Sequence, residues 1–302
     1  MERRVLVPYD GSDPAKAALD YALEAFPDCN LVILHVVEPF PDHGKAAGHP
    51  DRRSEQVFEE SERLLDTAEE RASEHGGEVE AELRYGRPVH AILRAIEEQG
   101  IEEVAIGSHG RDGAARLLLG SVAETVVRRA PVPVTVLPPG GDGDRRDGDR
   151  RDGRGFGSPG KVLVPFDGST CGRHALEYAL GQFSDASITA LYVIYPSVEE
   201  YDVIESETDL ESAIEERRSP GDRESEHVLA IAKRTAGEQG RDIELASRPG
   251  DPERALLEWI DEHGPDHVVM GCHGRDGLAR ILLGSVAETV VRRAPVPVTT
   301  VG

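Results

Sequence analysis

Short apolar runs of strand length alternate along this chain with longer segments in which apolar residues recur at helical spacing. In the first half, the pattern predicts strands at residues 4–8, 31–37, 79–85, 104–107 and 132–137, and helices at 14–26, 53–75, 88–99 and 121–129. The run at 31–37 is apolar throughout, as expected for a strand buried on both faces. This regular alternation predicts a parallel sheet with helices on both faces.

The second half of the chain repeats the first. VLVPYDGS at 5–12 returns as VLVPFDGS at 162–169. Residues 107–136 return at 271–300 with only four differences, so this segment is far more alike in the two copies than the rest. Self-similarity of this kind predicts two domains of the same fold.

The two copies also differ in length. RYGRP at 84–88 corresponds loosely to RPGDP at 248–252, so the second copy gains seven residues before its third strand. That copy carries an acidic insert at 198–226, which we interpret as a solvated surface excursion. The repeat predicts three parts of the chain: domain 1 at 1–138, a flexible linker without apolar periodicity at 139–160, and domain 2 at 161–302.

Acidic residues outnumber basic ones, with 57 Asp plus Glu against 34 Lys plus Arg, for a net charge of −23. Such a charge repels phosphates and excludes binding to nucleic acid or an anionic membrane through bulk electrostatics. We interpret it as adaptation to a salt-rich cytoplasm, such as that of a haloarchaeon, with an ordinary acidic bacterial protein as the alternative. The three cysteines have no metal-like spacing and fit a reducing cytosol. Because the sequence shows neither a signal-peptide pattern nor a long apolar run, we expect a cytoplasmic protein.

The segment shared most closely by the two copies is rich in glycine. GSHG at 107–110 follows an apolar strand, and after nine more residues Gly120 and Ser121 begin a helix. Ser121 and Glu124 fit a capping box in which Ser121 is the N-cap. The start of a helix favours an anion, and glycines let a ligand approach the backbone. The spacing matches neither a Walker A loop nor a dinucleotide fingerprint, and the alternative is that these residues only cap the helix and turn the chain.

Asp10 stands at the carboxyl end of the first predicted strand, and Asp167 occupies the same place in the second copy. In open parallel sheets, ligands bind outside the carboxyl ends of strands where the strand order reverses. A strand order of 3-2-1-4-5 would bring the ends of strands one and four together at that point. Asp10 could then contact a ribose hydroxyl or lie near a phosphate-bound metal. Alternatively, it could form an Asx turn that tightens the corner.

The glycine pattern, together with the VLVP-x-DGS start, resembles the universal stress protein family in its ATP-binding branch, and the resemblance covers both copies. It implies an α/β fold of two tandem Rossmann-like domains of the adenine nucleotide alpha hydrolase-like type. Each would have a five-stranded parallel sheet of order 3-2-1-4-5 and would bind ATP with Mg²⁺ or Mn²⁺. The family dimerises through its last strand, which implies an internal pseudo-dimer of the two domains, and a homodimer could also form.

The resemblance also implies a role for each site residue. Asp10 and Asp167 would contact the nucleoside end of ATP, and the backbones of Val36 and Val193 would read adenine. The other site residues would follow the ribose and the phosphates: Gly107, Gly110, Gly271 and Gly274 along ribose and α-phosphate, and Gly120, Ser121, Val122, Gly284, Ser285 and Val286 at the phosphates.

We therefore expect an ATP-binding regulatory protein of the stress response, with one nucleotide site per domain. The sequence shows no positioned general base or arginine finger, so we expect slow or no hydrolysis and assign no catalytic residue. Metal-ligating side chains are not assigned either, because His109 and His273 lack metal-spaced partners and His35 aligns with Tyr192. Two alternatives stay open: a true ATP-using enzyme of the wider superfamily, whose Ser-Gly-Gly-x-Asp-Ser and His-x-Gly-His motifs do not occur here, and an interaction module without a nucleotide.

Overall fold

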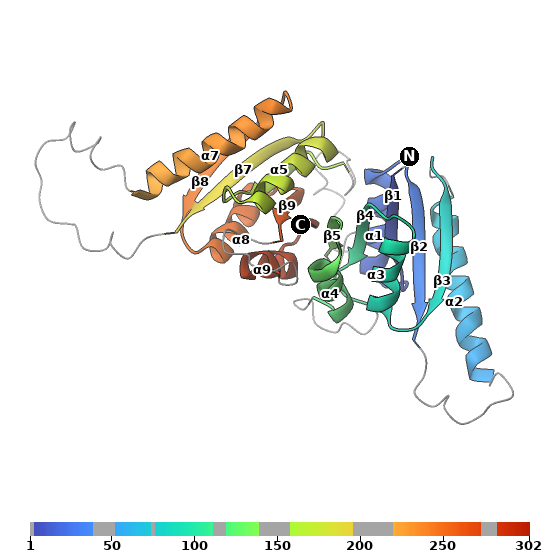
Figure 1. Cartoon of the computed structure of the whole chain (residues 1–302). Helices are drawn as coiled ribbons and strands as arrows, with labels where there is room; N and C mark the ends of the chain where they lie inside the picture. Colours follow the sequence, from blue (N-terminus) through green and yellow to red (C-terminus); the bar gives the residue numbers. More distant parts are fainter. Residues whose placement is uncertain are drawn as a thin grey trace, which may run out of the picture. The chain divides into compact units, whose positions relative to one another are not determined.

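The computed structural model describes residues 3–38, 52–73, 76–110, 119–138, 158–195, 220–272 and 283–302. By its contacts the chain divides into two compact units, Met1–Pro159 with Pro295–Thr300, and Gly160–Ala294 with Val301–Gly302. Figure 1 shows the elements of both units. Most of the predicted linker and most of the predicted acidic insert lie outside the described residues.

The first unit alternates strands and helices as the sequence predicts. Its elements are β1 (Arg4–Pro8), α1 (Asp13–Ala25), β2 (Asn30–Val37), α2 (Arg52–Arg71), β3 (Val79–Tyr85), α3 (Pro88–Glu98), β4 (Glu103–Gly107), α4 (Ser121–Arg129) and β5 (Val134–Leu137). The strands lie in the order β3-β2-β1-β4-β5, and each neighbouring pair is parallel. This confirms the predicted order 3-2-1-4-5, which places β1 beside β4.

The second unit repeats this series. Its elements are β6 (Lys161–Pro165), α5 (Thr170–Gln182), β7 (Ser187–Ile194), α7 (Pro220–Glu238), β8 (Glu244–Pro249), α8 (Pro252–His263), β9 (His267–Gly271), α9 (Ser285–Arg293) and β10 (Val298–Val301). The strand order β8-β7-β6-β9-β10 again follows 3-2-1-4-5. Part of the predicted surface insert belongs to this fold, because residues 220–226 form the start of α7. That helix is amphipathic and buries Val228, Ala232 and Ala236 at intervals of four residues.

The last strand contributes three residues to the first unit. Val298, Thr299 and Thr300 run antiparallel to β5, and contacts assign all three to that unit. Thr299 faces Thr135, and their hydroxyl oxygens lie 2.7 Å apart in a buried hydrogen bond. Every strand of the first unit is therefore paired along at least one edge.

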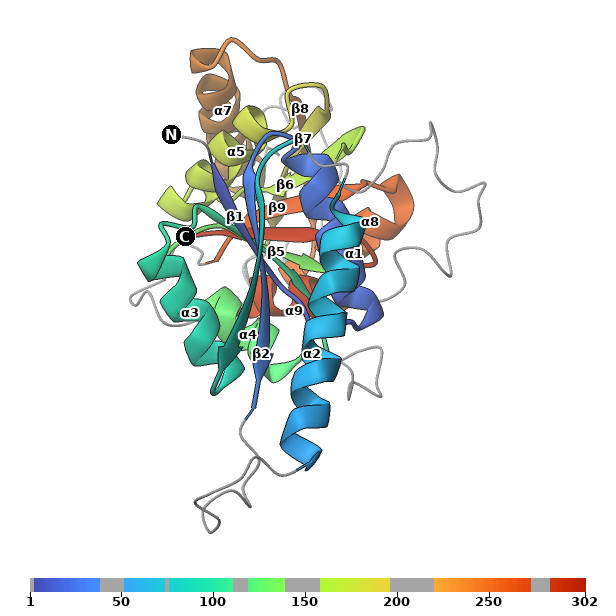
Figure 2. The ribbon, with the colours of Figure 1, turned by 90° about the vertical axis from the view of Figure 1, so that its right-hand side faces the viewer.

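Helices cover both faces of the β1–β5 sheet, with α1 and α2 on one face and α3 and α4 on the other (Figure 2). In α1, Ala15, Ala18 and Ala22 share one face and are buried, so the helix backbone packs closely on the strands. Tyr21 and Leu19 of the same helix are fully buried and fill the remaining space.

Two element boundaries differ from the predicted ones. Strand β5 begins at Val134 rather than at residue 132, because Pro131 and Pro133 lack the N–H groups that a ladder needs. Helix α1 begins at Asp13 with Ser12 as its N-cap, which makes Pro14 the second helical residue. Among the helices that the structure describes, none is long and apolar enough to cross a membrane.

Candidate functional site

The turn after β1 is shaped by Asp10, and the turn after β6 by Asp167. The Asp10 Oδ1 atom accepts the Ser12 N–H at 3.0 Å, and Asp167 Oδ1 accepts the Ser169 N–H at 2.9 Å. Between them, Gly11 has a φ of 78°, a conformation that other residues rarely adopt. The turns after β1 and β6 are thus both Asx turns, the structural role that the sequence also allows for Asp10. The second carboxylate oxygen, Oδ2, points elsewhere.

That second oxygen lies against the glycine segment. A Cβ atom on Gly110 would lie only 2.6 Å from Asp10 Oδ2. The Ser12 hydroxyl also donates to the carbonyl of His109 at 3.5 Å. The structure therefore brings together Asp10 and Gly110, two predicted site residues that are separated by 99 other positions in the sequence. A side chain at position 110 would therefore require the Asp10 carboxylate to shift.

Gly107 and Gly271, by contrast, are needed for packing. A Cβ atom on Gly107 would lie 2.7 Å from the carbonyl carbon of Pro14, at the start of α1. A Cβ atom on Gly271 would lie 2.8 Å from the carbonyl carbon of Cys171, at the start of α5. Each glycine lets a helix start press against the end of the neighbouring strand. This close approach explains the glycine at both positions without any ligand.

The start of α4 corrects the predicted capping box. Gly120 is the N-cap, with φ −64° and ψ 146°, and Ser121 is the first helical residue. The Ser121 hydroxyl is one position too late to cap, and Glu124 pairs with Arg128 at 2.9 Å instead of reaching back. Gly284 is likewise the N-cap of α9, where Ser285 is the first helical residue. Neither helix start has a side-chain cap among the described residues.

A backbone hydrogen bond explains why the cap falls on glycine. The Gly120 N–H donates to the carbonyl of Ser108 at 2.7 Å, and the Gly284 N–H donates to the carbonyl of Cys272 at 2.8 Å. A Cβ atom on Gly120 would lie 3.1 Å from the Cα of His109. The strand end and the helix start therefore lie in direct contact.

Val36 presents its backbone beyond the end of β1. The Leu34 carbonyl accepts the Tyr9 N–H at 2.8 Å on the β1 side, whereas the Val37 carbonyl accepts the Gly86 N–H at 3.0 Å on the β3 side. Backbone groups alternate sides along a strand, so the N–H and C=O of Val36 point toward β1. The paired register of β1 ends at Leu34, two residues earlier.

The second copy shows the same alternation. The Leu191 carbonyl accepts the Phe166 N–H at 2.9 Å, and the Ile194 carbonyl accepts the Gly250 N–H at 3.0 Å. Val193 therefore also turns its backbone groups toward the space beyond the first strand of its own copy. Both valines predicted to read adenine occupy this position.

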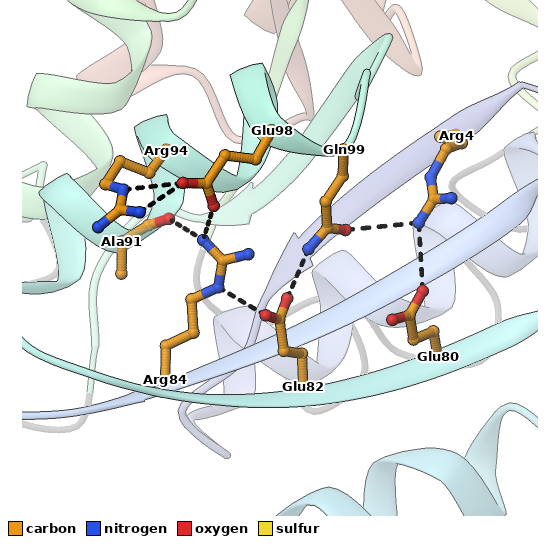
Figure 3. A network of polar contacts seen from close by, with 8 residues as sticks. All are labelled: Arg4, Glu80, Glu82, Arg84, Ala91, Arg94, Glu98 and Gln99. Carbon is orange, nitrogen blue, oxygen red and sulfur yellow. Dashed lines mark hydrogen bonds and ion pairs between the residues drawn. The ribbon is translucent and has the colours of Figure 1, made fainter.

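Arg84 is the basic side chain of β3 that stands opposite Val36 in register. Its guanidinium donates to Glu82 at 2.7 Å and to Glu98 at 3.1 Å, within a polar network that also includes Arg94 (Figure 3). The hydrogen bond from Arg84 to Glu82 is the main cause that raises the Arg84 pKa. The Arg84 guanidinium thus pairs with carboxylates, which makes it a poor candidate for binding a phosphate.

One predicted site residue, Gly274, lies outside the described residues, which leave out 111–118 and 273–282. In the part that is described, no group of three or more His, Cys, Asp or Glu side chains could hold a metal ion. Sequence reasoning missed the carbonyls of Ser108 and Cys272, which hold the two helix starts. A backbone role leaves no side-chain signal, and the two copies indeed carry different residues there.

Comparison with known proteins identifies the family of this fold. The sequence profile of the universal stress protein family matches residues 1–138 and again 159–302. A universal stress protein of Mycobacterium tuberculosis is 30% identical over 306 residues, which covers 97% of this chain and 95% of that protein. A shorter one from Methanocaldococcus jannaschii is 33% identical over 140 residues, which covers 45% of this chain and 81% of that protein.

A solved structure shows the same fold over nearly the whole chain. The crystal structure of a universal stress protein from Archaeoglobus fulgidus has a TM-score of 0.69 at 24% identity, and the match covers 99% of this chain and 97% of that chain. Another similar structure is a universal stress protein in complex with cAMP, with a TM-score of 0.33 at 25% identity over 48% of this chain and 98% of that chain.

Proposed function

This chain belongs to the universal stress protein family, and from that premise we propose that each of its two copies binds ATP as a regulatory ligand in a stress response. The observation that carries the proposal is the pair of glycine-capped helix starts. Gly120 and Gly284 each place the first amides of a helix beside the end of a parallel strand, at the point where the strand order reverses.

The phosphates would bind at the starts of α4 and α9. The first N–H groups of a helix have no intrahelical partner, and the helix dipole favours an anion there. Helices α1 and α5 use up one such amide each, because Ser12 caps Ala15 at 3.3 Å and Ser169 caps Gly172 at 3.0 Å. At α4 and α9 a glycine replaces the capping side chain, which leaves the amides of Ser121, Val122, Ser285 and Val286 as donors for phosphate oxygens.

The nucleoside would lie between the first two strands and the glycine segment. Adenine presents one donor and adjacent acceptors at its edge, and the N–H and C=O of Val36 or Val193 would match them. Gly110 and Gly107 would follow the ribose and α-phosphate, as Gly271 and Gly274 would in the second copy. Asp10 Oδ2 and its counterpart on Asp167 would accept a ribose hydroxyl.

ATP would carry Mg²⁺ or Mn²⁺ into the site. Such ions are commonly held by phosphate oxygens, waters and one or two carboxylates, and Asp10 is a half-buried carboxylate at the pocket. The ion would neutralise phosphate charge. Asp10 Oδ1 is already engaged with the Ser12 N–H. We therefore propose a binding site with slow or no hydrolysis rather than an efficient enzyme.

Proline at the first helical position offers a sharp test. It is tolerated there because its fixed φ suits the first turn, and it removes one N–H that the helix itself does not use. Gly120 and Gly284 are extended, as a residue before proline must be. We expect calorimetric titration of Mg-ATP in molar KCl to show two sites in the wild type. Ser121→Pro and Ser285→Pro should each weaken one site by roughly tenfold or more, the value of a charged hydrogen bond.

The control is Thr125→Ala on the same helix, whose hydroxyl donates to the Ser121 carbonyl at 2.6 Å. It should leave the affinity unchanged. Circular dichroism and thermal melting establish that the three single variants and the Ser121→Pro, Ser285→Pro double variant fold. Full affinity in the Ser121→Pro, Ser285→Pro double variant would refute the phosphate assignment, and absence of binding in the wild type would favour the interaction module. Rapid release of phosphate would favour the enzyme.

We also propose that the last strands join the two copies as an internal pseudo-dimer. Support comes from the antiparallel register in which Thr299 faces Thr135. A Thr135→Cys, Thr299→Cys variant should form a disulfide within one chain and migrate as a 32.7 kDa monomer on a non-reducing gel. A disulfide-linked dimer would instead indicate that two chains pair through these strands, as a homodimer.

The acidic surface suggests salt adaptation, which we propose reflects a haloarchaeal setting. A net charge of −23 repels itself at low ionic strength, and molar salt screens that repulsion. The urea midpoint should therefore rise between low-salt buffer and molar KCl. An unchanged midpoint would favour the ordinary acidic protein.

A further inference from the structure

Two of the three cysteines of the chain stand at the candidate site of the second copy. Cys171 is the second residue of α5, and Cys272 directly follows β9. In the first copy, the corresponding positions hold Pro14 and Ser108. The third cysteine, Cys29, is buried at the start of β2, in the other copy. The second copy therefore has a pair of thiols that the first copy lacks.

The backbone brings these two residues together. A Cβ atom on Gly271 would lie 2.8 Å from both the Cβ and the carbonyl carbon of Cys171. Cys272 is the next residue, and consecutive Cα atoms are about 3.8 Å apart. Cys171 also acts electrostatically on Cys272: burial, and then the neighbouring Cys171, raise the pKa of Cys272 to about 11.

Cys272 also links the end of β9 to the start of α9 and to β10. Its N–H donates to the Val301 carbonyl at 2.9 Å, and its carbonyl accepts the N–H of Gly284, the N-cap of α9. Its Sγ atom donates weakly to the same Val301 carbonyl at 3.1 Å. Both Cys171 and Cys272 are half-buried, so a small oxidant can reach them.

We propose that Cys171 and Cys272 form a reversible intramolecular disulfide, which makes the second copy a redox modification site. Cys171 reacts first, because burial raises the pKa of the Cys272 thiol to about 11 and so keeps Cys272 protonated. With a hydroperoxide as the oxidant, the Cys171 thiolate takes up one oxygen to become a sulfenic acid, and the peroxide leaves as hydroxide. The Cys272 thiol then attacks that sulfur, the S–S bond forms, and the sulfenic oxygen leaves as water. Overall, two thiols and one hydrogen peroxide give one disulfide and two waters.

The disulfide would act on the second pocket alone. Forming it requires Cys272 Sγ to leave the Val301 carbonyl and to turn toward α5, with Cα atoms about 4.4–6.8 Å apart. Because the Cys272 carbonyl holds Gly284, this shift displaces the start of α9. The expected consequence, a changed ATP affinity at the second site only, rests on the proposed function; formation of the disulfide does not.

Peptide mapping of the full-length protein tests the modification. The reduced chain is exposed to hydrogen peroxide, its remaining thiols are alkylated, and it is digested with trypsin without reduction. We expect the thiols to fall from three to one per chain, with Cys29 alkylated. Peptides 162–173 and 255–275 should be joined, and dithiothreitol should restore all three thiols. Joined peptides from different chains, or three intact thiols, would overturn the proposal.

Two variants serve as controls, and the first copy indicates which residue is tolerated in one of them. Cys272→Ser places the residue of position 108 at its counterpart, so the fold should be kept, and oxidised Cys171 should then proceed to sulfinic acid, which dithiothreitol does not restore. Cys29→Ser should leave the joined peptides unchanged. Persistence of reversible oxidation in Cys272→Ser would contradict a Cys171–Cys272 bond. In calorimetry, oxidation should change Mg-ATP affinity about as much in Ser121→Pro as in wild type, and dithiothreitol should reverse the change in both of these proteins but not in Cys272→Ser. If the chain bound no ATP, the peptide map would still decide the modification.

Discussion

The two copies place residues of different charge at one buried position of the fold. In the first unit, the fully buried Glu103 side chain pairs with Arg3 at 2.9 Å, and the Arg3 guanidinium also lies 4.6 Å from the ring centre of Phe26. In the second unit, the equivalent residue is His267, also fully buried, whose ring packs 4.9 Å from that of Phe183. A charged pair in one copy is thus an uncharged aromatic contact in the other.

The partners at this position change together. Phe26 corresponds to Phe183 and is kept, whereas Arg3 corresponds to Gly160, which has no side chain to offer. A buried carboxylate needs its cation, because an isolated charge in the interior is costly. A buried histidine avoids that cost by staying neutral. Between the two copies, the balance of charge at this position persists, and the residue does not.

The largest effect on stability is expected when Arg3, the cation that pairs with Glu103, is removed. Arg3→Ala should lower the free energy of unfolding of the first unit by about 3 kcal/mol, because the Glu103 carboxylate remains buried without its cation. This lies at the lower end of the usual range because the Arg3 side chain is 34% exposed and partly screened by water. Hydrogen exchange of β1 and β2 amides in the full chain should quicken by roughly a hundredfold.

The control for this prediction places the residues of the second unit at the equivalent positions of the first. Arg3→Gly combined with Glu103→His copies the second unit into the first and should recover most of the lost stability. Trp259, the single tryptophan of the chain, lies in α8 and should report an unchanged second unit in every variant. A double variant no more stable than Arg3→Ala would show that the two solutions are not interchangeable.

The sequence alone predicted the sheet order, the repeat and the meeting of Asp10 with Gly110. The elements follow from apolar periodicity and the repeat from self-similarity, whereas the order 3-2-1-4-5 was implied by the family resemblance. Given that order, Asp10 and Gly110 meet because the carboxyl ends of neighbouring parallel strands lie at the same edge of the sheet. It failed on the cap of α4, where glycine and serine are both acceptable and the choice depends on a bond from Gly120 to Ser108. It also gave Gly107 a place along the ligand, whereas the structure supplies a packing reason, contact with Pro14. Both shortfalls involve backbone contacts between distant segments, which leave no local pattern.

Acid should lower the stability of the second unit through His267, a residue that the first unit does not have at this position. Burial lowers the pKa of His267 from 6.5 to about 3, so the folded second unit keeps this ring neutral while the unfolded chain protonates it below pH 6.5. Between these values, the unfolded state binds more protons, and stability falls as the pH falls. The loss at pH 5 should be about 2 kcal/mol relative to neutral pH, and above pH 6.5 the term vanishes.

Urea unfolding followed by Trp259 fluorescence at pH 7.5 and pH 5 measures this loss in the second unit. Carboxylates elsewhere also titrate in acid, so the informative quantity is the difference between wild type and His267→Gln, which keeps a polar side chain of similar size without the ionisation. The variant should lose the extra pH dependence. An equal slope in both proteins would contradict the assignment to His267.

The smallest effect concerns the corner between the first helix and second strand of each copy. In the first unit, Gly77 packs so closely that a Cβ there would lie 1.9 Å from the Cys29 carbonyl oxygen. In the second unit, Arg241 takes that position and donates to the carbonyls of Leu180 at 3.0 Å and Ala186 at 3.2 Å. One copy closes the corner by backbone contact, and the other closes it with a long side chain. Arg241→Ala should therefore lower the free energy of unfolding of the second unit by about 1.5 kcal/mol, within the range for hydrogen bonds to a charged group.

The matched variant for this last prediction is Arg241→Lys. Lysine keeps the charge but lacks the planar fork that reaches several carbonyls at once, so it should restore only part of the loss. The urea midpoint of Trp259 reports the stability, and hydrogen exchange at residues 183–187 reports the corner itself. Full recovery with lysine would mean that charge at the end of α5 matters rather than the fork, since a cation there also complements the helix dipole. The corner would then be held electrostatically in the second copy and sterically in the first.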